Sequence, residues 1–188
     1  MSPFRPCAIV GLGNPGENYR WTRHNAGKIF LDNLARDLNI PLTQRKDSIL
    51  WGEGMVDGLR VFLSFPETYM NLSGRVVPWM KQKNIDLPER VLILSDDINL
   101  PSGTLRYREG GGAGGQKGLL SIIQAAGSDR IARIRVGVGS PPPGVDLSDY
   151  VLGQIPSSER ESFVLAWKSF REMVDRWLLS MRKTSDGA

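Results

Sequence analysis

The chain has 188 residues, of which 40% are hydrophobic and 23% are charged. This composition excludes a largely disordered protein and suffices for one domain with a buried core, which we expect to span residues 1–188. No apolar run approaches the length of a membrane-spanning helix, and an apolar segment follows Met1 so closely that no signal or transit peptide fits before it. The formal charge of +4 favours nucleic acid or another acidic partner. Cys7 is the only cysteine, which excludes an internal disulfide and fits a reducing cytoplasm.

The first half of the chain predicts a strand, a helix, a hairpin and a second helix. A continuous apolar run opens the chain, as is typical of a buried strand. The next apolar residues recur on one helical face up to Pro41. Asp57-Gly58 lies between two further apolar runs and predicts a two-residue hairpin. The expected elements are a strand at 6–12, a helix at 25–38, hairpin strands at 50–56 and 59–65, and a helix at 75–84 with Pro78 in its first turn.

The second half alternates strands with helices. We expect strands at 90–95, 104–108 and 133–139, and helices at 116–126 and 146–152. A last helix begins with a capping box from Ser158 to Glu161, and residues 182–188 are expected to fray. Its apolar stripe favours packing on the sheet over partner binding and comprises Phe163, Trp167, Phe170, Val174, Trp177 and Met181. The pattern predicts an α/β fold, a single-domain twisted mixed β-sheet with helices on both faces.

The loop after the first strand reads Gly11-Leu12-Gly13-Asn14-Pro15-Gly16, which matches the dinucleotide fingerprint G-x-G-x-x-G. That fingerprint must open a helix, but Pro15 interrupts it and residues 17–23 have no apolar helical face. We therefore favour a tight turn over a nucleotide-dependent oxidoreductase. The turn places an exposed Asn14 at the carboxyl end of a strand, where sites gather in α/β sheets.

His24 is the only histidine and follows the same strand closely. A lone histidine is usually a surface or core residue, but an imidazole beside a strand end suits proton transfer near neutral pH. Asp96, at the end of the strand at 90–95, is expected to orient it, and Asp97 to form a turn. A Mg²⁺ site on the two carboxylates stays an alternative, although it would normally need a triphosphate ligand. Cys7 faces the core of its strand and is rejected as a nucleophile, and the usual zinc ligands are not available.

Two further loops carry groups that suit substrate binding. Asn71 either caps a helix or donates a hydrogen bond to a developing oxyanion, and its side chain suits both roles. The glycine loop at 110–118 exposes backbone N–H groups before a helix, and Lys117 adds a charge, which together favour a phosphate. It is not a Walker A loop, because Gly118 stands where that motif needs Ser or Thr.

Arginines alternate on the two strands that flank this loop. Arg106 and Arg108 share one face of their strand, and Arg133 and Arg135 share one face of theirs. Beside a phosphate-type loop, this pattern favours a surface that binds a nucleic-acid backbone over an ordinary solvated face.

These motifs together resemble those of bacterial peptidyl-tRNA hydrolases. The block N-P-G-x-x-Y followed by T-R-H-N-x-G is the most specific part of the resemblance, which covers most of residues 6–155 in the family's order. The matching segments are residues 10–19, 22–27, 69–74, 96–101, 110–118 and 133–139.

The resemblance implies hydrolysis of the ester between peptide and tRNA in N-blocked peptidyl-tRNA, with no metal and no cofactor. It implies that His24 accepts a proton from water, that Asp96 stabilises the histidine, and that Asn14 distinguishes blocked from free aminoacyl esters. Asn71 is expected to hold the oxyanion. The residues expected to line the path of the peptide and the tRNA 3′ end are Tyr19, Tyr69, Met70 and Asn71, and those expected at the tRNA backbone are Arg106, Arg108 and Arg133. The chain shows no exposed interface stripe, which favours a monomer.

One departure from the family falls in the glycine loop. Family members typically read G-G-x-G-G-H-N-G, and this chain has Gln116-Lys117 in place of His-Asn. Lys117 can donate hydrogen bonds and bind phosphate but cannot accept a hydrogen bond. The departure opens an alternative, a non-catalytic RNA-binding protein like the splicing-factor relatives of the family. The presence of Asn14, His24, Asp96 and Asn71 favours the hydrolase.

Overall fold

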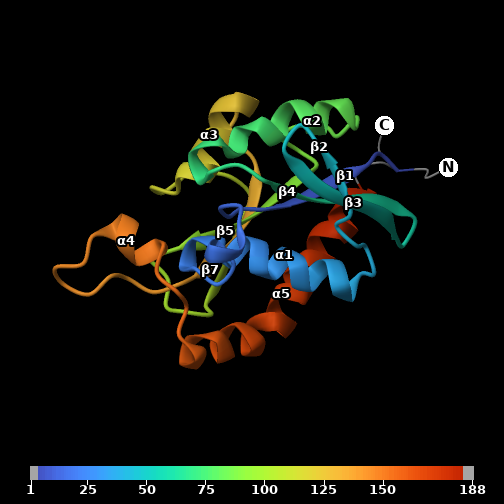
Figure 1. Cartoon of the computed structure of the whole chain (residues 1–188). Coiled ribbons are helices and arrows are strands. Elements are labelled where there is room, and N and C mark those ends of the chain that lie inside the picture. Colours follow the sequence, from blue (N-terminus) through green and yellow to red (C-terminus); the bar gives the residue numbers. More distant parts are fainter. Residues whose placement is uncertain (1–3, 184–188) are drawn as a thin grey trace.

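A computed structural model describes residues 4–183, and in that range it contains one seven-stranded sheet (Figure 1). The strand order is β2-β3-β4-β1-β5-β7-β6. The central strands β4, β1, β5 and β7 are parallel neighbours, whereas β2, β3 and β6 pair antiparallel at the two sides. The strands are β1 Cys7–Gly11, β2 Gln44–Lys46, β3 Ile49–Val56, β4 Leu59–Pro66, β5 Val91–Asp97, β6 Leu105–Arg108 and β7 Ala132–Gly137.

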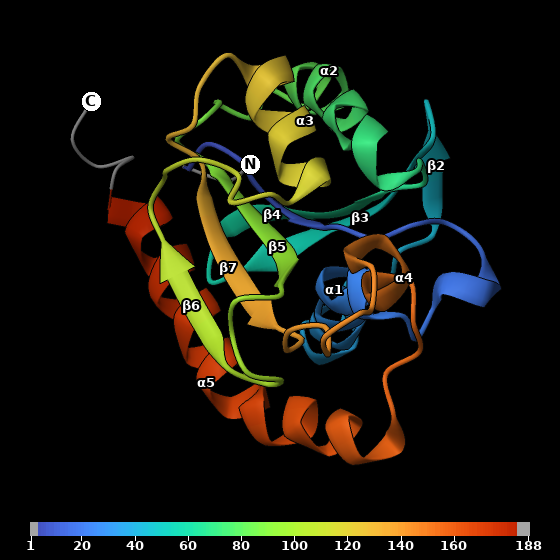
Figure 2. The same cartoon turned by 90° about the vertical axis from the view of Figure 1, so that its left-hand side faces the viewer.

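Helices cover both faces of this mixed sheet, which confirms the predicted fold class. Helices α1 and α5 lie on one face, and α2 and α3 lie on the other (Figure 2). The α-helices are α1 Ala26–Asp37, α2 Val76–Gln82, α3 Lys117–Ala126, α4 Leu147–Val151 and α5 Ser157–Lys183. Residues 4–183 also contain three 3₁₀ helices, η1 Glu17–Tyr19, η2 Arg23–Asn25 and η3 Met70–Arg75. Among the described residues, no helix combines the length and hydropathy that crossing a membrane requires.

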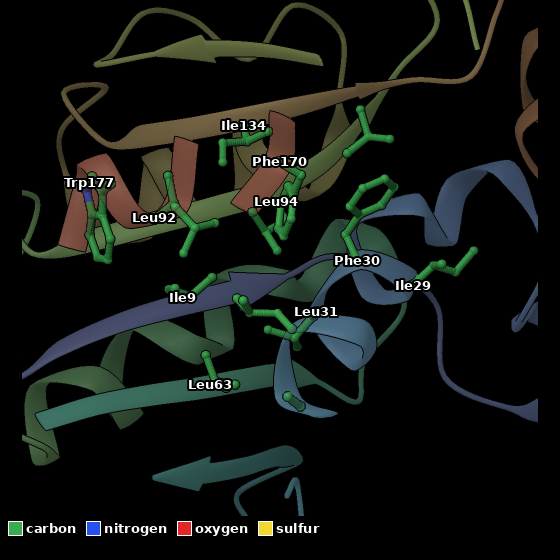
Figure 3. Packing of buried hydrophobic residues seen from close by; sticks show 14 of the residues in the cluster. Ile9, Ile29, Phe30, Leu31, Leu63, Leu92, Leu94, Ile134, Phe170 and Trp177 are labelled. Carbon is green, nitrogen blue, oxygen red and sulfur yellow. The ribbon is translucent and has the colours of Figure 1, made fainter. Parts of the chain in front are cut away.

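Successive side chains of the central strands point to opposite faces of the sheet and belong to two separate hydrophobic cores. On one face, Ile9 and Leu94 pack against Phe30 of α1 and Phe170 of α5 (Figure 3). On the opposite face, neighbouring strand residues pack with Trp79 of α2 and Leu119 of α3. Burying one such side chain contributes about 1.5–3 kcal/mol, so the sheet is held from both sides. Every member of the predicted α5 stripe lies in or against the first core, which confirms its packing role.

Two glycines let α1 lie unusually close to the sheet. A Cβ on Gly27 would meet the Leu94 carbonyl oxygen at 2.1 Å, and one on Gly11 would meet the Leu31 Cβ at 2.7 Å. The backbone N–H of Leu12 donates to the Leu94 carbonyl, and that of Lys28 donates to the Leu12 carbonyl. The start of α1 is therefore bonded to the residue that follows β1, and it packs closely against the backbone of β5.

Most predicted elements agree with the structure to within one or two residues. The hairpin turn at Asp57 and Gly58 has positive φ at both positions, 49° and 82°, as its sequence predicted. Strand β2 and the 3₁₀ helices were not predicted. The capping-box prediction was wrong, because α5 begins at Ser157 and Ser158 lies inside its first turn. The predicted fraying from residue 182 was also wrong at 182–183, which are helical, and residues 184–188 lie outside the described range.

Candidate active site

A cavity of about 650 Å³ opens beside the carboxyl ends of β1 and β5. Parallel strands end at the same edge of a sheet, so the loops after β1 and β5 converge there. The segments after β4 and before α3 complete the cavity, and α4 forms a further wall. The structure brings most of the predicted site residues together in its lining, namely Asn14, Tyr19, His24, Tyr69, Met70, Asn71, Asp96 and Lys117.

His24 and Asp96 form a histidine–carboxylate pair in the described structure. The His24 Nδ1 atom lies 3.0 Å from Asp96 Oδ2, and the side chains are 13% and 3% exposed. An ionised carboxylate only accepts hydrogen bonds, so Nδ1 carries the proton and Nε2 keeps its lone pair. The pair therefore has the geometry of an oriented general base facing a cavity.

The sequence block around His24 folds so that it presents the imidazole to Asp96. The Thr22 hydroxyl donates to the Tyr19 carbonyl at 2.8 Å, which closes the turn before η2. His24 lies within η2, and α1 follows directly, held against β5 by the close approach at Gly27. The imidazole is thus positioned by a short rigid turn rather than by a long loop.

Asn14 is held in one orientation by its neighbours. Asn25 accepts from the Asn14 backbone N–H at 2.8 Å and donates its Nδ2 to the Asn14 carbonyl at 3.0 Å. The Asn14 Oδ1 atom accepts from the Met70 N–H at 2.8 Å. The prediction of an exposed Asn14 was wrong, since the residue is only 7% exposed. Because Oδ1 is engaged, the Nδ2 donor is the end of the side chain available to a molecule in the cavity.

The segment after β4 supplies the neighbouring wall. Tyr69 is the residue that caps η3, and Asn71 lies within that helix, so the capping role considered for Asn71 is excluded. Asn71 is exposed and lines the cavity, as does Tyr69, which is 62% exposed. Met70 is buried beneath them, and its N–H holds Asn14.

Asp96 and Asp97 have distinct partners. Asp97 Oδ1 accepts from the Asn99 backbone N–H at 2.8 Å, and Arg135 Nη1 lies 3.5 Å from its Oδ2. Asp97 therefore forms the predicted turn. Both oxygens of Asp96 are also engaged, one by His24 and the other by Gln116 Nε2 at 3.0 Å. Three of these four oxygens have hydrogen-bond partners within the protein, the fourth faces Arg135, and no further acidic, histidine or cysteine ligand joins them among the described residues, so the arrangement does not favour the alternative of a Mg²⁺ site.

Gln116 is a residue of the site that sequence reasoning did not recognise. Besides its bond to Asp96, its Oε1 accepts from the Leu119 N–H at 2.6 Å and so caps α3. The available signal was its place, directly before a predicted helix and at the position where the resembling family has histidine.

Arg133 is not on the surface, which corrects its predicted role at the tRNA backbone. It is 0% exposed, and its guanidinium donates to the carbonyls of Ile131, Asp129, Gly111 and Gly112. Burial, reinforced by the nearby Arg135 charge, lowers its pKa from the ordinary value. Arg133 therefore supports the glycine loop from behind, because the loop covers the face of β7 on which the arginine lies.

Arg106 and Arg108 are exposed on β6 outside the cavity. They lie directly opposite Arg135 and Arg133 in the β6–β7 register, so all four arginines share one face of the sheet. The exposed pair extends the positive charge of the glycine loop along the edge of the sheet. The glycine loop also lines the cavity through Gly114, Gly115 and Lys117, so the cavity and this edge are continuous.

The fold and this arrangement of groups define an α/β protein in which an imidazole–carboxylate pair lines a cavity beside a basic sheet edge. Comparison with known proteins identifies the family. The family model described as peptidyl-tRNA hydrolase matches residues 8–186. A peptidyl-tRNA hydrolase of Agathobacter rectalis is 46% identical over 181 residues, 96% of each chain, and one of Bacillus subtilis is 46% identical over 80% of each.

Solved structures agree with this assignment. The crystal structure of peptidyl-tRNA hydrolase from Acinetobacter baumannii superposes with a TM-score of 0.87 at 37% identity, covering 98% of this chain and 93% of that one. The chain belongs to the peptidyl-tRNA hydrolase family, which confirms the resemblance seen in the sequence and makes it an enzyme of the hydrolase class.

Proposed function

We propose that this chain hydrolyses the ester bond between peptide and tRNA in N-blocked peptidyl-tRNA, releasing free tRNA for reuse in translation. The observation that carries the proposal is the His24–Asp96 pair, held at 3.0 Å on the wall of a cavity that adjoins a basic edge. A cavity of about 650 Å³ has the size of sites that enclose small organic groups, such as a terminal aminoacyl ribose.

The proposed reaction is general-base hydrolysis. Water between His24 Nε2 and the ester carbonyl loses its proton to the imidazole and attacks the carbonyl carbon. Asp96 stabilises the imidazolium that forms. Asn71, at the cavity wall, donates to the oxyanion. The oxyanion then collapses and breaks the ester bond as the imidazolium returns its proton to the departing ribose 3′ oxygen, which regenerates the neutral base. Such a base contributes about 10²–10⁴-fold to the rate, and an oxyanion donor about 10²–10³-fold.

Substrate recognition is assigned to two regions. Asn14 Nδ2 donates to the acyl carbonyl that only an N-blocked substrate carries, while Tyr19, Tyr69 and Met70 line the path of the peptide and the tRNA 3′ end. Lys117, Arg106 and Arg108 bind phosphates of the tRNA. This recognition is independent of tRNA sequence and weakens with salt.

We keep a monomer as the expected working unit, because the sequence shows no exposed interface stripe. We place the reaction in the cytoplasm, because peptidyl-tRNA arises where ribosomes work.

The decisive experiment measures peptide release from N-acetyl-aminoacyl-tRNA. We expect His24→Ala to lower kcat by about 10²–10⁴-fold because the base is lost, and Asp96→Asn to lower it because the amide no longer stabilises imidazolium. Asp97→Asn is the matched control, since it alters the neighbouring carboxylate without contacting His24, and it should lose far less activity.

Binding of uncharged tRNA by His24→Ala, together with an unchanged circular dichroism spectrum, shows that the variant is folded. Equal, slow release by wild type and His24→Ala would contradict the proposed catalysis. That result would favour the non-catalytic RNA-binding alternative.

A further inference from the structure

We infer that Gln116 is a positioning residue of the hydrolytic site: its amide N–H holds the second carboxylate oxygen of Asp96, and its carbonyl oxygen caps α3. The inference rests on the proposed roles of His24 and Asp96. It concerns the position at which this chain departs from the family pattern.

The contacts of Gln116 fix which end of its amide faces Asp96. The Leu119 N–H belongs to the first turn of α3 and needs an acceptor, which Oε1 supplies at 2.6 Å. The opposite end of the amide must then be the NH₂ group, and it lies 3.0 Å from Asp96 Oδ1. One orientation of the side chain therefore satisfies a helix terminus and a buried carboxylate together.

Asp96 is consequently held from two sides. His24, on η2, bonds Oδ2, and Gln116, at the start of α3, bonds Oδ1. A carboxylate with one donor on each oxygen resists rotation about its Cβ–Cγ bond, so Oδ2 stays directed at Nδ1. Asp96 is 4% exposed, and water cannot easily replace a lost donor at such a site.

The packing around Gln116 leaves its side chain little freedom. The Met70 Sδ atom lies 3.2 Å from Nε2. A Cβ on Gly118 would meet Met70 Sδ at 2.4 Å, Ser73 Oγ at 3.0 Å and Gln116 Oε1 at 3.1 Å. The first turn of α3 is thus pressed against η3, with Gln116 between them and Asp96.

The test separates the bond to Asp96 from the helix cap. Gln116→Glu keeps an oxygen for the Leu119 N–H but puts a carboxylate against Asp96 in place of a donor. We expect the melting temperature to fall by a few degrees, because repulsion between the new carboxylate and Asp96 outweighs the favourable anion at the helix N-terminus. We expect kcat to fall by about tenfold or more, with KM changed by less than about threefold.

The pH profile supplies a readout that a structural cap would not move. The added negative charge favours the protonated imidazole, so the pH of half-maximal kcat should rise by about half a unit or more. The other charged groups lining the cavity are Asp97, Lys117, Arg135 and Asp146, and none of them is altered.

Gln116→Met is the second variant, because it removes both hydrogen bonds without adding charge. It should lower both kcat and the melting temperature. Ile122→Val, a buried change in α3 away from the cavity, is the stability control and should lower the melting temperature with wild-type kcat and pH profile.

Wild-type kcat and pH profile in Gln116→Glu would overturn the inference. A second result would also overturn it. If Ile122→Val and Gln116→Met lose the same amount of melting temperature and also the same amount of kcat, the loss of kcat comes from lost stability alone. If His24→Ala is inactive while Gln116→Glu is normal, only this inference fails. If His24→Ala is active, both this inference and the proposed function fail.

Discussion

At the scale of single residues, the orientation of one amide decides which group faces the substrate. The Met70 N–H binds Asn14 Oδ1, which leaves Nδ2 toward the cavity. In Asn14→Asp, one oxygen still accepts from Met70, so the local fold is kept. The other oxygen can no longer donate to an acyl carbonyl but can accept from a free ammonium.

We therefore predict that Asn14→Asp reduces the preference for the blocked substrate. The kcat/KM for N-acetyl-aminoacyl-tRNA, divided by that for aminoacyl-tRNA, should fall by about tenfold or more, as expected for a lost hydrogen bond to a buried polar group. The two substrates are assayed side by side with the same tRNA. An unchanged ratio would argue against the role of Asn14.

Cys7 gives a prediction about pH. Burial raises the pKa of its thiol from 9.0 to about 12. The folded thiol therefore holds its proton more tightly than the unfolded one, so its contribution to stability is complete below about pH 9 and is lost as the pH rises towards 12.

Iodoacetamide at pH 8 should accordingly modify native Cys7 only at the rate at which the protein opens, and modify it rapidly in urea. Mass spectrometry of the labelled chain measures both rates. Labelling of the native protein as fast as a free thiol would contradict the burial of this residue.

At the scale of elements, strands β6 and β7 carry arginines with opposite tasks. Arg133 on β7 is itself buried and donates to four backbone carbonyls, whereas Arg106 and Arg108 on β6 face solvent. We predict that Arg133→Met lowers the free energy of unfolding by roughly 3 kcal/mol, because it leaves those acceptors without a donor. Urea denaturation measures this loss.

Arg106→Gln is the matched variant on the facing strand. It should leave the free energy of unfolding nearly unchanged. The slope of log affinity against log salt concentration should become shallower by about one, as expected for the loss of one phosphate contact. Filter binding of uncharged tRNA at several salt concentrations gives that slope. The reverse assignment, with Arg133→Met affecting only the slope, would restore Arg133 to the tRNA surface.

The same strands show why the sequence predicts helices and strands better than it predicts which groups surround their side chains. The buried strands and α1 were predicted because their apolar residues recur with the strand or helix period. Residues 44–46 are Gln-Arg-Lys, all exposed, and form β2 only because β3 offers its backbone edge. Alternation placed Arg133 and Arg135 on one face, but it contains no information on what covers that face.

The site was predictable to the same extent. The motif block places His24 and Asn14 after one strand and Asp96 after another, and parallel strands bring such ends together. Gln116 was not recognised because glutamine is not one of the usual helix-capping residues, and only the position of Asp96 in space reveals its second bond. The 3₁₀ helices that carry His24 and Met70 make hydrogen bonds to segments distant in the sequence, and such bonds have no periodic signal.

At the scale of the whole molecule, one sheet separates two hydrophobic cores that share its strands. Ile134 belongs to the core under α1 and α5, and Ile122 to the core under α2 and α3. Because both cores need the same sheet, they should unfold in one transition.

We predict that Ile134→Val and Ile122→Val each cost about 0.5–1.5 kcal/mol and that the double variant costs their sum to within about 0.5 kcal/mol. Urea titration followed by both circular dichroism and tryptophan fluorescence should give coincident curves. Separate transitions for the two probes would mean that the faces unfold independently.

The strand order has a consequence for how the enzyme is made. Strand β1 lies between β4 and β5, which are both synthesised after it. A nascent chain that has already exposed His24 and Asp96 still lacks the cap of α3 and the α4 wall, which extends to Leu152. While it is being translated, this polypeptide is itself a peptidyl-tRNA, and it acquires the means to cleave such a molecule only late in its own synthesis.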